Sequence, residues 1–182
     1  MMEPDVREDT NRAGFCHRHF SMMAKRRKRL SVALILQSHL AEVERAEFSA
    51  RAPKEDDCFV CREIEWGMKH MLVTIFKLYE EEAEFRELFA GQTGLCRPHR
   101  RRLLADGRRK LSRKRYGEFS RECDRLCEKS LREIREEIDR FCRMFDYRSR
   151  GAEEDFASCR DSIERAVEWL TTHPPEGAGS AK

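Results

Sequence analysis

Two short stretches of this chain repeat a pattern of residues that could bind a metal. Each reads Gly, a large apolar residue, Cys, two spacers and His, at Gly14 to His19 and again at Gly94 to His99, with an offset of 80 residues. A Cys and a His separated by two residues can curl around one metal ion. Each stretch is therefore a candidate half of a metal site.

A CxxC knuckle, Cys58 to Cys61, is separated from Cys96 by 34 intervening residues. Joined to Cys96 and His99, it would supply three thiolates and one imidazole, the donor set of a closed structural zinc site. Soft sulfur ligands argue against magnesium and calcium. We therefore predict a main site made of Cys58, Cys61, Cys96 and His99, with zinc (Zn2+) as the cofactor.

In this pairing Cys16 and His19 form an orphan half-site. A faithful repeat would place their CxxC partner near position −22, upstream of Met1, so we expect the chain to be a truncated or mis-started version of a longer one. Two alternatives stay open. Cys123 and Cys127, spaced i, i+4, could complete the site, or the site has degenerated and Cys16 is a core thiol.

The elements that must position these residues are helices. Apolar periodicity predicts them from Cys16 to about Phe48, from Cys61 to about Phe89, from about Pro98, from Ser112 or Tyr116 to Phe145, and from about Glu153 to Leu170. We expect the second to break at about Leu78 to Glu84, where glutamates interrupt the pattern, and to end with Gly91 as its C-cap. Pro98 suits the first turn of the next helix.

The predicted fold class is all-α: a helical bundle of about five helices built from two related zinc-knuckle helical units, the first incomplete. We predict a single helical domain over 1–172, made of the truncated first unit at 1–50, the zinc-stapled second unit at 51–111 and C-terminal helices at 112–172. Residues 173–182 have the composition of a disordered tail.

The composition indicates where in the cell the protein is expected. Charged residues make up 39% of the 182, and the chain has no run of about 18 apolar residues that could span a membrane. No secretory segment stands at the N-terminus. A cytoplasmic location without a membrane partner is expected, with the eight cysteines as thiols, metal ligands or core residues rather than disulfides.

Residues 97–115 hold ten cationic side chains against one Asp. The ten are Arg97, Arg100, Arg101, Arg102, Arg108, Arg109, Lys110, Arg113, Lys114 and Arg115. Such a segment beside a zinc knuckle is compatible with binding nucleic acid or another polyanion, with strong salt dependence. The segment lacks interleaved aromatic residues, and the acidic stretch at 132–140 could instead pair with it inside the molecule.

The sequence does not favour an enzyme. A Cys3His set closes the zinc shell, and no HExxH, GxSxG, P-loop or GxGxxG motif is present. We predict a zinc-binding, non-catalytic interaction or scaffold module with an unknown protein partner. Polyanion binding through 97–115 is the alternative; a metal- or thiol-dependent enzyme, with Cys16 and His19 as nucleophile and base, is the second.

The stretch "MEPDVREDTNRAGFCHRHF" resembles the early motif of an uncharacterised bacterial family, catalogued only as a domain of unknown function. Members resemble this chain in a "DVRxxTNxxGFCxxHF" stretch, a second CxxC, a GxCxxH and a C-terminal "FxxKFDYR"-like segment, which "CRMFDYR" (Cys142 to Arg148) fits. The family's upstream CPxC-type knuckle has no counterpart here, in line with the expected truncation. The resemblance implies a shared architecture and metal binding, and no catalytic activity.

Overall fold

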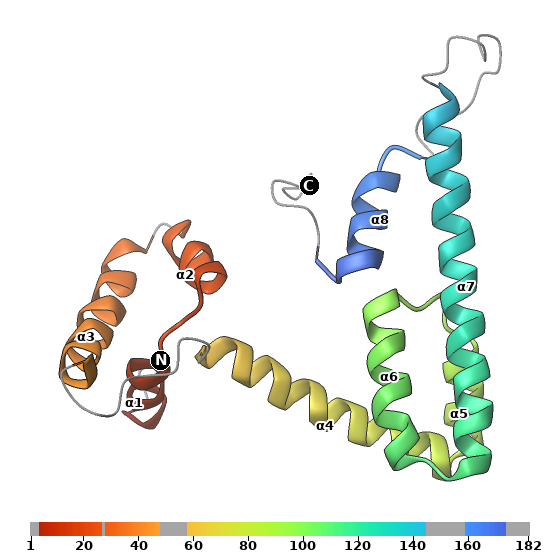
Figure 1. Cartoon of the computed structure of the whole chain (residues 1–182), viewed down its shortest axis with the longest axis horizontal. Helices are drawn as coiled ribbons and strands as arrows, with labels where there is room; N and C mark the ends of the chain where they lie inside the picture. Colours follow the sequence, from red (N-terminus) through yellow and green to blue (C-terminus); the bar gives the residue numbers. More distant parts are fainter. Residues whose placement is uncertain (1–3, 27, 48–57, 145–158, 174–182) are drawn as a thin grey trace. The chain divides into compact units, whose positions relative to one another are not determined.

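The computed structural model describes residues 4–26, 28–47, 58–144 and 159–173 of the chain. Its regular elements there are all α-helices, shown in Figure 1, and the described residues contain no strand. The helices are α1 (Pro4–Ala13), α2 (His17–Ala24), α3 (Arg29–Glu47), α4 (Phe59–Glu81), α5 (Ala83–Ala90), α6 (Arg97–Lys110), α7 (Arg113–Met144) and α8 (Ser162–Thr171). The predicted all-α class is confirmed.

The predicted number of about five helices is wrong, because eight are described. Helix α1 carries few apolar side chains, so apolar periodicity could not reveal it. The predicted helix from Cys16 to Phe48 is divided at a run of cations. Helix α2 ends at Ala24 and α3 begins at Arg29, and Lys25 and Arg29 are like charges at the i, i+4 spacing that destabilises a continuous helix.

The predicted break in the second long helix is confirmed. Helix α4 ends at Glu81, and Glu82 adopts an extended backbone with φ −110° and ψ 124° before α5 begins. Arg86 donates a hydrogen bond of 2.9 Å to the carbonyl of Tyr79 and so satisfies a carbonyl in the last turn of α4. Gly91 caps α5, as predicted, and donates its N–H to the carbonyl of Glu87 at 2.9 Å.

The remaining helix boundaries agree in part with the prediction. Pro98 lies in the first turn of α6, and α7 is helical up to Met144, while its predicted end at Phe145 lies outside the described residues. Helix α8 covers the later part of the predicted last helix, whose expected start at Glu153 lies outside the described residues. The predicted tail also lies outside them from residue 174 on.

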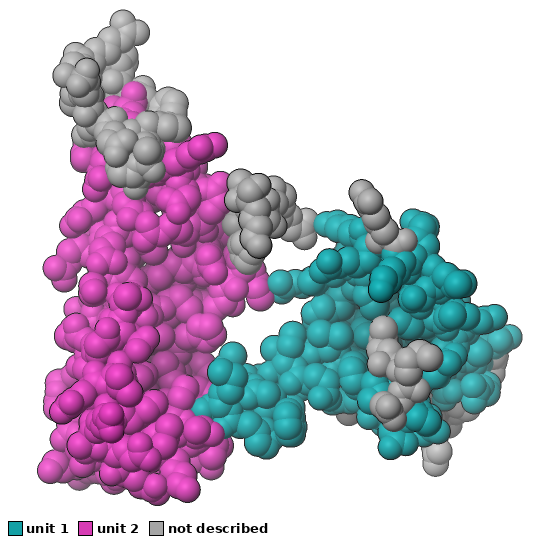
Figure 2. Space-filling view, turned by 180° about the vertical axis from the view of Figure 1, so that it is seen from behind, with its two compact units in different colours: residues 1–71 teal, residues 72–182 magenta. Residues whose placement is uncertain are grey.

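The chain divides into two compact units, Met1–Met71 (unit 1) and Leu72–Lys182 (unit 2), coloured separately in Figure 2. The single domain predicted over 1–172 and its construction from two related zinc-knuckle units stay predictions. No helix among the described residues is both long and apolar enough to cross a membrane.

In unit 1, α1 and α2 pack against α3. The described side chains that are buried here are few, and they gather near the start of α4: Thr10, Ala13, Phe15 and Cys58. The Phe15 ring meets the Phe20 ring at 5.4 Å and the Phe59 ring at 6.5 Å between centroids, both edge-on. The core of this unit therefore lies beside its cysteines.

Unit 2 has an aromatic core. Helix α6 packs on α7 and α8, and α7 packs on α8. The fully buried ring of Phe119 lies 4.8 Å from that of Tyr79 and 5.1 Å from that of Phe89. Helix α6 approaches this cluster at Gly107, where an added Cβ would lie 3.3 Å from the Phe119 ring. Neither Cys96 nor His99 takes part in this aromatic packing, whereas Cys123 and Cys159 are fully buried core residues of unit 2.

Candidate metal centre

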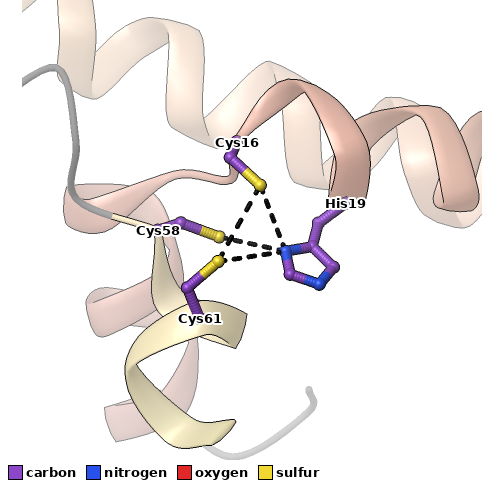
Figure 3. A group of neighbouring side chains, drawn as sticks. All are labelled: Cys16, His19, Cys58 and Cys61. Carbon is purple, nitrogen blue, oxygen red and sulfur yellow. Dashed lines mark hydrogen bonds between the residues drawn. The ribbon is translucent and has the colours of Figure 1, made fainter. Parts of the chain in front are cut away.

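Four side chains of unit 1 converge at the starts of two helices. Cys16 and His19 come from the start of α2, and Cys58 and Cys61 from the start of α4 (Figure 3). Their sulfur and imidazole nitrogen atoms all lie within 4.8 Å of one another. Three thiols and one imidazole therefore face a common point.

The distances among these atoms have the dimensions of a zinc tetrahedron. With bonds of about 2.3 Å to sulfur and about 2.05 Å to nitrogen, sulfur–sulfur edges are about 3.8 Å and sulfur–nitrogen edges about 3.6 Å. The Sγ atoms of Cys16 and Cys61 are 3.9 Å apart. His19 Nδ1 lies 3.2 Å from the Cys16 Sγ, 3.3 Å from the Cys58 Sγ and 3.6 Å from the Cys61 Sγ. Small movements would therefore give tetrahedral bond lengths.

Each pair of ligands spans the first turn of a helix. Cys16 is the N-cap of α2 in an extended conformation (φ −68°, ψ 164°), and Cys58 immediately precedes α4. The second ligand follows three residues later in both pairs, and residues at i and i+3 lie on one face of a helix. Neighbouring His17 instead approaches Ser21, with its Nε2 3.4 Å from the hydroxyl oxygen.

Gly14 joins the two helix starts. Its φ of +63° lies in the left-handed region that favours glycine, and an added Cβ would lie 2.5 Å from the His39 ring. The Gly14 carbonyl accepts a 3.1 Å hydrogen bond from the N–H of Phe59. This bond fixes the residue before Phe15 to the residue after Cys58, so the two ligand pairs are held together by the backbone.

The three cysteines of the cluster differ in their exposure to solvent. Cys58 is buried, Cys16 is half-buried and Cys61 is exposed. Burial by itself raises the pKa of Cys58, but hydrogen bonds from the backbone of Cys16 and Cys61 and from the His19 side chain outweigh it and lower the pKa to about 6. Cys58 is therefore ready to bind a metal as a thiolate near neutral pH.

Cys61 responds in the opposite direction. Burial, together with hydrogen bonds to and negative charge on Cys58 and Cys16, raises the pKa of Cys61 to about 11. The negative charge of one thiolate thus disfavours ionisation of the next thiol, and a cation at the centre of the cluster would relieve this repulsion. The electrostatics favour a bound divalent ion.

The grouping predicted from spacing is therefore corrected. Cys58 and Cys61 meet Cys16 and His19 within unit 1, in place of Cys96 and His99 of unit 2. Spacing could not decide between two equivalent half-sites, because the knuckle is separated by 38 residues from His19 and by 34 from Cys96. The half-site at Cys16 and His19 therefore has a CxxC partner in unit 1, and the expected truncation of the chain stays a prediction.

The other cysteines named as candidate partners lie in unit 2. Cys123 and Cys127 are buried on α7. Burial, followed by the charge of Asp124, raises the pKa of Cys123 to about 12, as expected for a core thiol. Cys96 is half-buried at the N-cap of α6, and its Sγ lies 3.1 Å from Nδ1 of His99.

The basic segment is divided between internal ion pairs and solvent. Arg100 pairs with Asp124 at 2.6 Å, Arg102 with Asp106 and Arg115 with Glu118. The other seven cations are exposed: Arg97, Arg101, Arg108, Arg109, Lys110, Arg113 and Lys114. Within the acidic stretch at 132–140, Glu137 pairs with Arg165 of α8.

All four residues of the cluster are named by the sequence analysis, which divides them between two half-sites. The feature of the sequence that relates Cys16 to Cys58 is a phenylalanine beside each cysteine. Phe15 precedes Cys16 and Phe59 follows Cys58, and the two rings pack together, whereas Cys96 follows a leucine.

Comparison with known proteins supports the sequence resemblance. No curated protein and no solved structure matches the chain. A family described as a family of unknown function, DUF6062, matches over residues 1–50 and 44–177. These ranges include all four residues of the centre and nearly the whole chain, so the chain belongs to this family of unknown function.

Proposed function

We propose that this protein is a zinc-binding, non-catalytic helical module that acts by binding a protein partner. The observation that carries the proposal is the Cys3His cluster, whose atoms lie within 4.8 Å of one another. Zinc prefers thiolate and imidazole donors, and structural zinc is four-coordinate. The donor set and its tetrahedral dimensions both support zinc.

The closed donor set supports a structural role. A catalytic zinc keeps one coordination position for water or substrate, whereas three thiolates and an imidazole occupy all four. The ion would hold α2 to the start of α4 in a unit with few buried side chains. Zinc at Cys16, His19, Cys58 and Cys61 would thus stabilise the fold of unit 1.

Helix α3 supplies the surface for a partner. It is 19 residues long with no buried residue, although aliphatic side chains are spread along it. Leu30 and Leu34 are 74% and 48% exposed and lie at i and i+4, on one face of the helix. Exposed apolar side chains that share a face are a frequent mark of a protein-binding surface.

Metal analysis tests the zinc assignment. Protein purified under reducing conditions should contain zinc, and Cys16→Ser should remove one equivalent per chain. Serine is also a favourable N-cap, so the substitution suits the start of α2. The matched control is Cys142→Ser, which changes an exposed thiol on α7. Metal content that is equal in Cys16→Ser and Cys142→Ser would refute the assignment.

Site-specific photocrosslinking tests the partner. A photoreactive residue at Leu34 should capture one defined protein in cells, and the same residue at exposed Glu44, also on α3, serves as the matched control. The Leu34 crosslink should weaken when Leu30→Glu is added. A crosslink of equal yield from Glu44, or one insensitive to Leu30→Glu, would contradict a role for this face.

Polyanion binding is a second candidate, supported by a specific arrangement on α6. Arg97, Arg101 and Arg108 are exposed and, at i, i+4 and i+11, lie within about 40° of one another around the helix. If each meets one phosphate of a DNA duplex, the triple change to Gln should reduce the slope of log affinity against log salt by roughly 3. An unchanged slope, or no mobility shift at low salt, would exclude this candidate.

A further inference from the structure

The pair Cys96 and His99 has the local geometry of the half-site that is completed in unit 1. Cys96 is an N-cap with φ −77° and ψ 157°, and Cys16 is an N-cap with φ −68° and ψ 164°. The Sγ to Nδ1 distance is 3.1 Å in the first pair and 3.2 Å in the second. Unit 2 therefore carries a second pair of soft donors arranged to meet one ion.

The loop before Cys96 is fixed to the neighbouring helices. The N–H of Leu95 donates to the Ser130 hydroxyl on α7 at 3.0 Å, and the Leu95 carbonyl accepts from the Trp169 indole on α8 at 3.1 Å. Gly94 allows this close approach, because an added Cβ would lie 2.0 Å from the Ser130 hydroxyl oxygen. The two donors are thus positioned against α7 and α8 before any metal binds.

An open groove of about 400 Å³ lies beside the pair. Cys96 and His99 line it together with Glu133 of α7 and Glu168 of α8. Both carboxylates are on exposed residues, so their side chains can rotate toward an ion. The groove's cation, Arg165, is bound by both carboxylate oxygens of Glu137, at 2.7 and 2.6 Å.

We propose that Cys96, His99, Glu133 and Glu168 form a second zinc site, in unit 2, that is open to solvent. The thiolate and imidazole hold the ion, and the carboxylates close on it by side-chain rotation. Zinc accepts carboxylate oxygen alongside sulfur and nitrogen. One thiolate in an open groove gives weaker binding than three thiolates around a partly buried point, so this site should lose its zinc first.

Chelator titration of the full chain tests the proposal. Wild-type protein should bind two zinc ions per chain and release them in two steps. Cys96→Ser should lose the weaker step and keep the tighter one, and serine's preference for the N-cap position keeps α6 intact. Loss of a direct ligand should weaken the second site by more than the roughly 10- to 100-fold that an outer-shell partner is worth. Cys142→Ser is the control that should keep both steps.

Cadmium-113 NMR distinguishes the two sites by their number of thiolates. Two resonances are expected, the more deshielded one from Cys16, Cys58 and Cys61. Cys16→Ser should alter only that resonance, and Cys96→Ser should remove only the other, so failure of one site is separable from failure of the other. A single resonance in wild-type protein would overturn the proposal.

The double change Glu133→Gln and Glu168→Gln tests the carboxylates. It should lower the zinc affinity of the second site by at least about tenfold, because loss of even an outer-shell partner costs roughly that much. The zinc affinity of the first site should not change. Unchanged affinity would overturn the assignment of these ligands. A metal-dependent dimer with 1.5 ions per chain would also overturn it, because two copies of the Cys96–His99 pair would then share one ion.

Discussion

Cys61→Ser should unfold unit 1 and leave unit 2 folded. Cys61 is exposed, so the change removes little packing, and its effect reports the lost metal bond. The binding energy of a structural zinc ion is about 10–16 kcal/mol in small zinc domains, or roughly 2.5–4 kcal/mol for each of four ligands. Full burial of a side chain such as Phe15 contributes only about 1.5–3 kcal/mol. The metal is therefore the larger contribution.

Hydrogen exchange followed by mass spectrometry measures this effect in each unit separately. A loss of roughly 3 kcal/mol corresponds to about a 100-fold faster exchange, since each 1.4 kcal/mol is a factor of ten. We expect this acceleration in peptides from α1, α2 and the first turns of α4. Peptides from α6 and α7 should keep their wild-type protection, because Phe119 and its neighbours need no metal.

Cys142→Ser makes the same chemical change at an exposed thiol of unit 2 and should leave both patterns unaltered. Treatment of the wild-type protein with a strong zinc chelator should reproduce the Cys61→Ser pattern in unit 1. Unchanged exchange in α1 and α2 after complete removal of the metal would refute the reasoning. So would equal loss of protection in both units.

Three further outcomes are expected. Zinc binding above pH 7 should release a proton from Cys61, whose pKa is raised to about 11. Zinc binding should release a second proton, from Cys58, only below pH 6, because the pKa of Cys58 is lowered to about 6. Affinity should therefore fall more steeply below pH 6 than above it; calorimetry in buffers of different ionisation enthalpy would show this, and a constant slope would contradict it. Gly14→Ala should destabilise unit 1 by at least about 1–2 kcal/mol, the cost of the left-handed conformation for other residues; thermal unfolding with no change would show that the turn relaxes freely. Phe119→Ala should cost unit 2 about 3–5 kcal/mol in urea unfolding and leave the zinc content of the Cys3His site intact.

Local signals account for the parts of the fold that could be predicted. The break between α4 and α5, the Gly91 cap and the start of α6 at Pro98 each depend on a few neighbouring residues. Helix α1 escapes apolar periodicity because its inward face is built partly from a polar residue, the buried Thr10 beside Ala13. Apolar periodicity continues across the cations at Lys25 and Arg29, so it gives no sign of the division between α2 and α3.

The pairing of the half-sites could not be predicted because it is a tertiary choice. Cys16–His19 and Cys96–His99 are alike in sequence and in backbone conformation, so residue types and spacing suit the knuckle at Cys58 equally. The choice depends on packing between Phe15 and Phe59 and on the hydrogen bond from Phe59 to Gly14. Residue type and spacing identified the candidate residues, and tertiary packing determines which of them meet.

The two half-sites lie in units with different sources of stability, and this difference determines what zinc can do in each. Unit 2 buries Phe119, Leu126 and Cys123 almost completely, so its groove can gain or lose an ion while α6, α7 and α8 stay packed. In unit 1 the buried Cys58 belongs to the candidate centre itself, so zinc bound there would be coupled to the folding of the unit. Because α3 packs against α1 and α2 in unit 1, the surface at Leu30 and Leu34 should bind its partner only when the Cys3His site holds zinc.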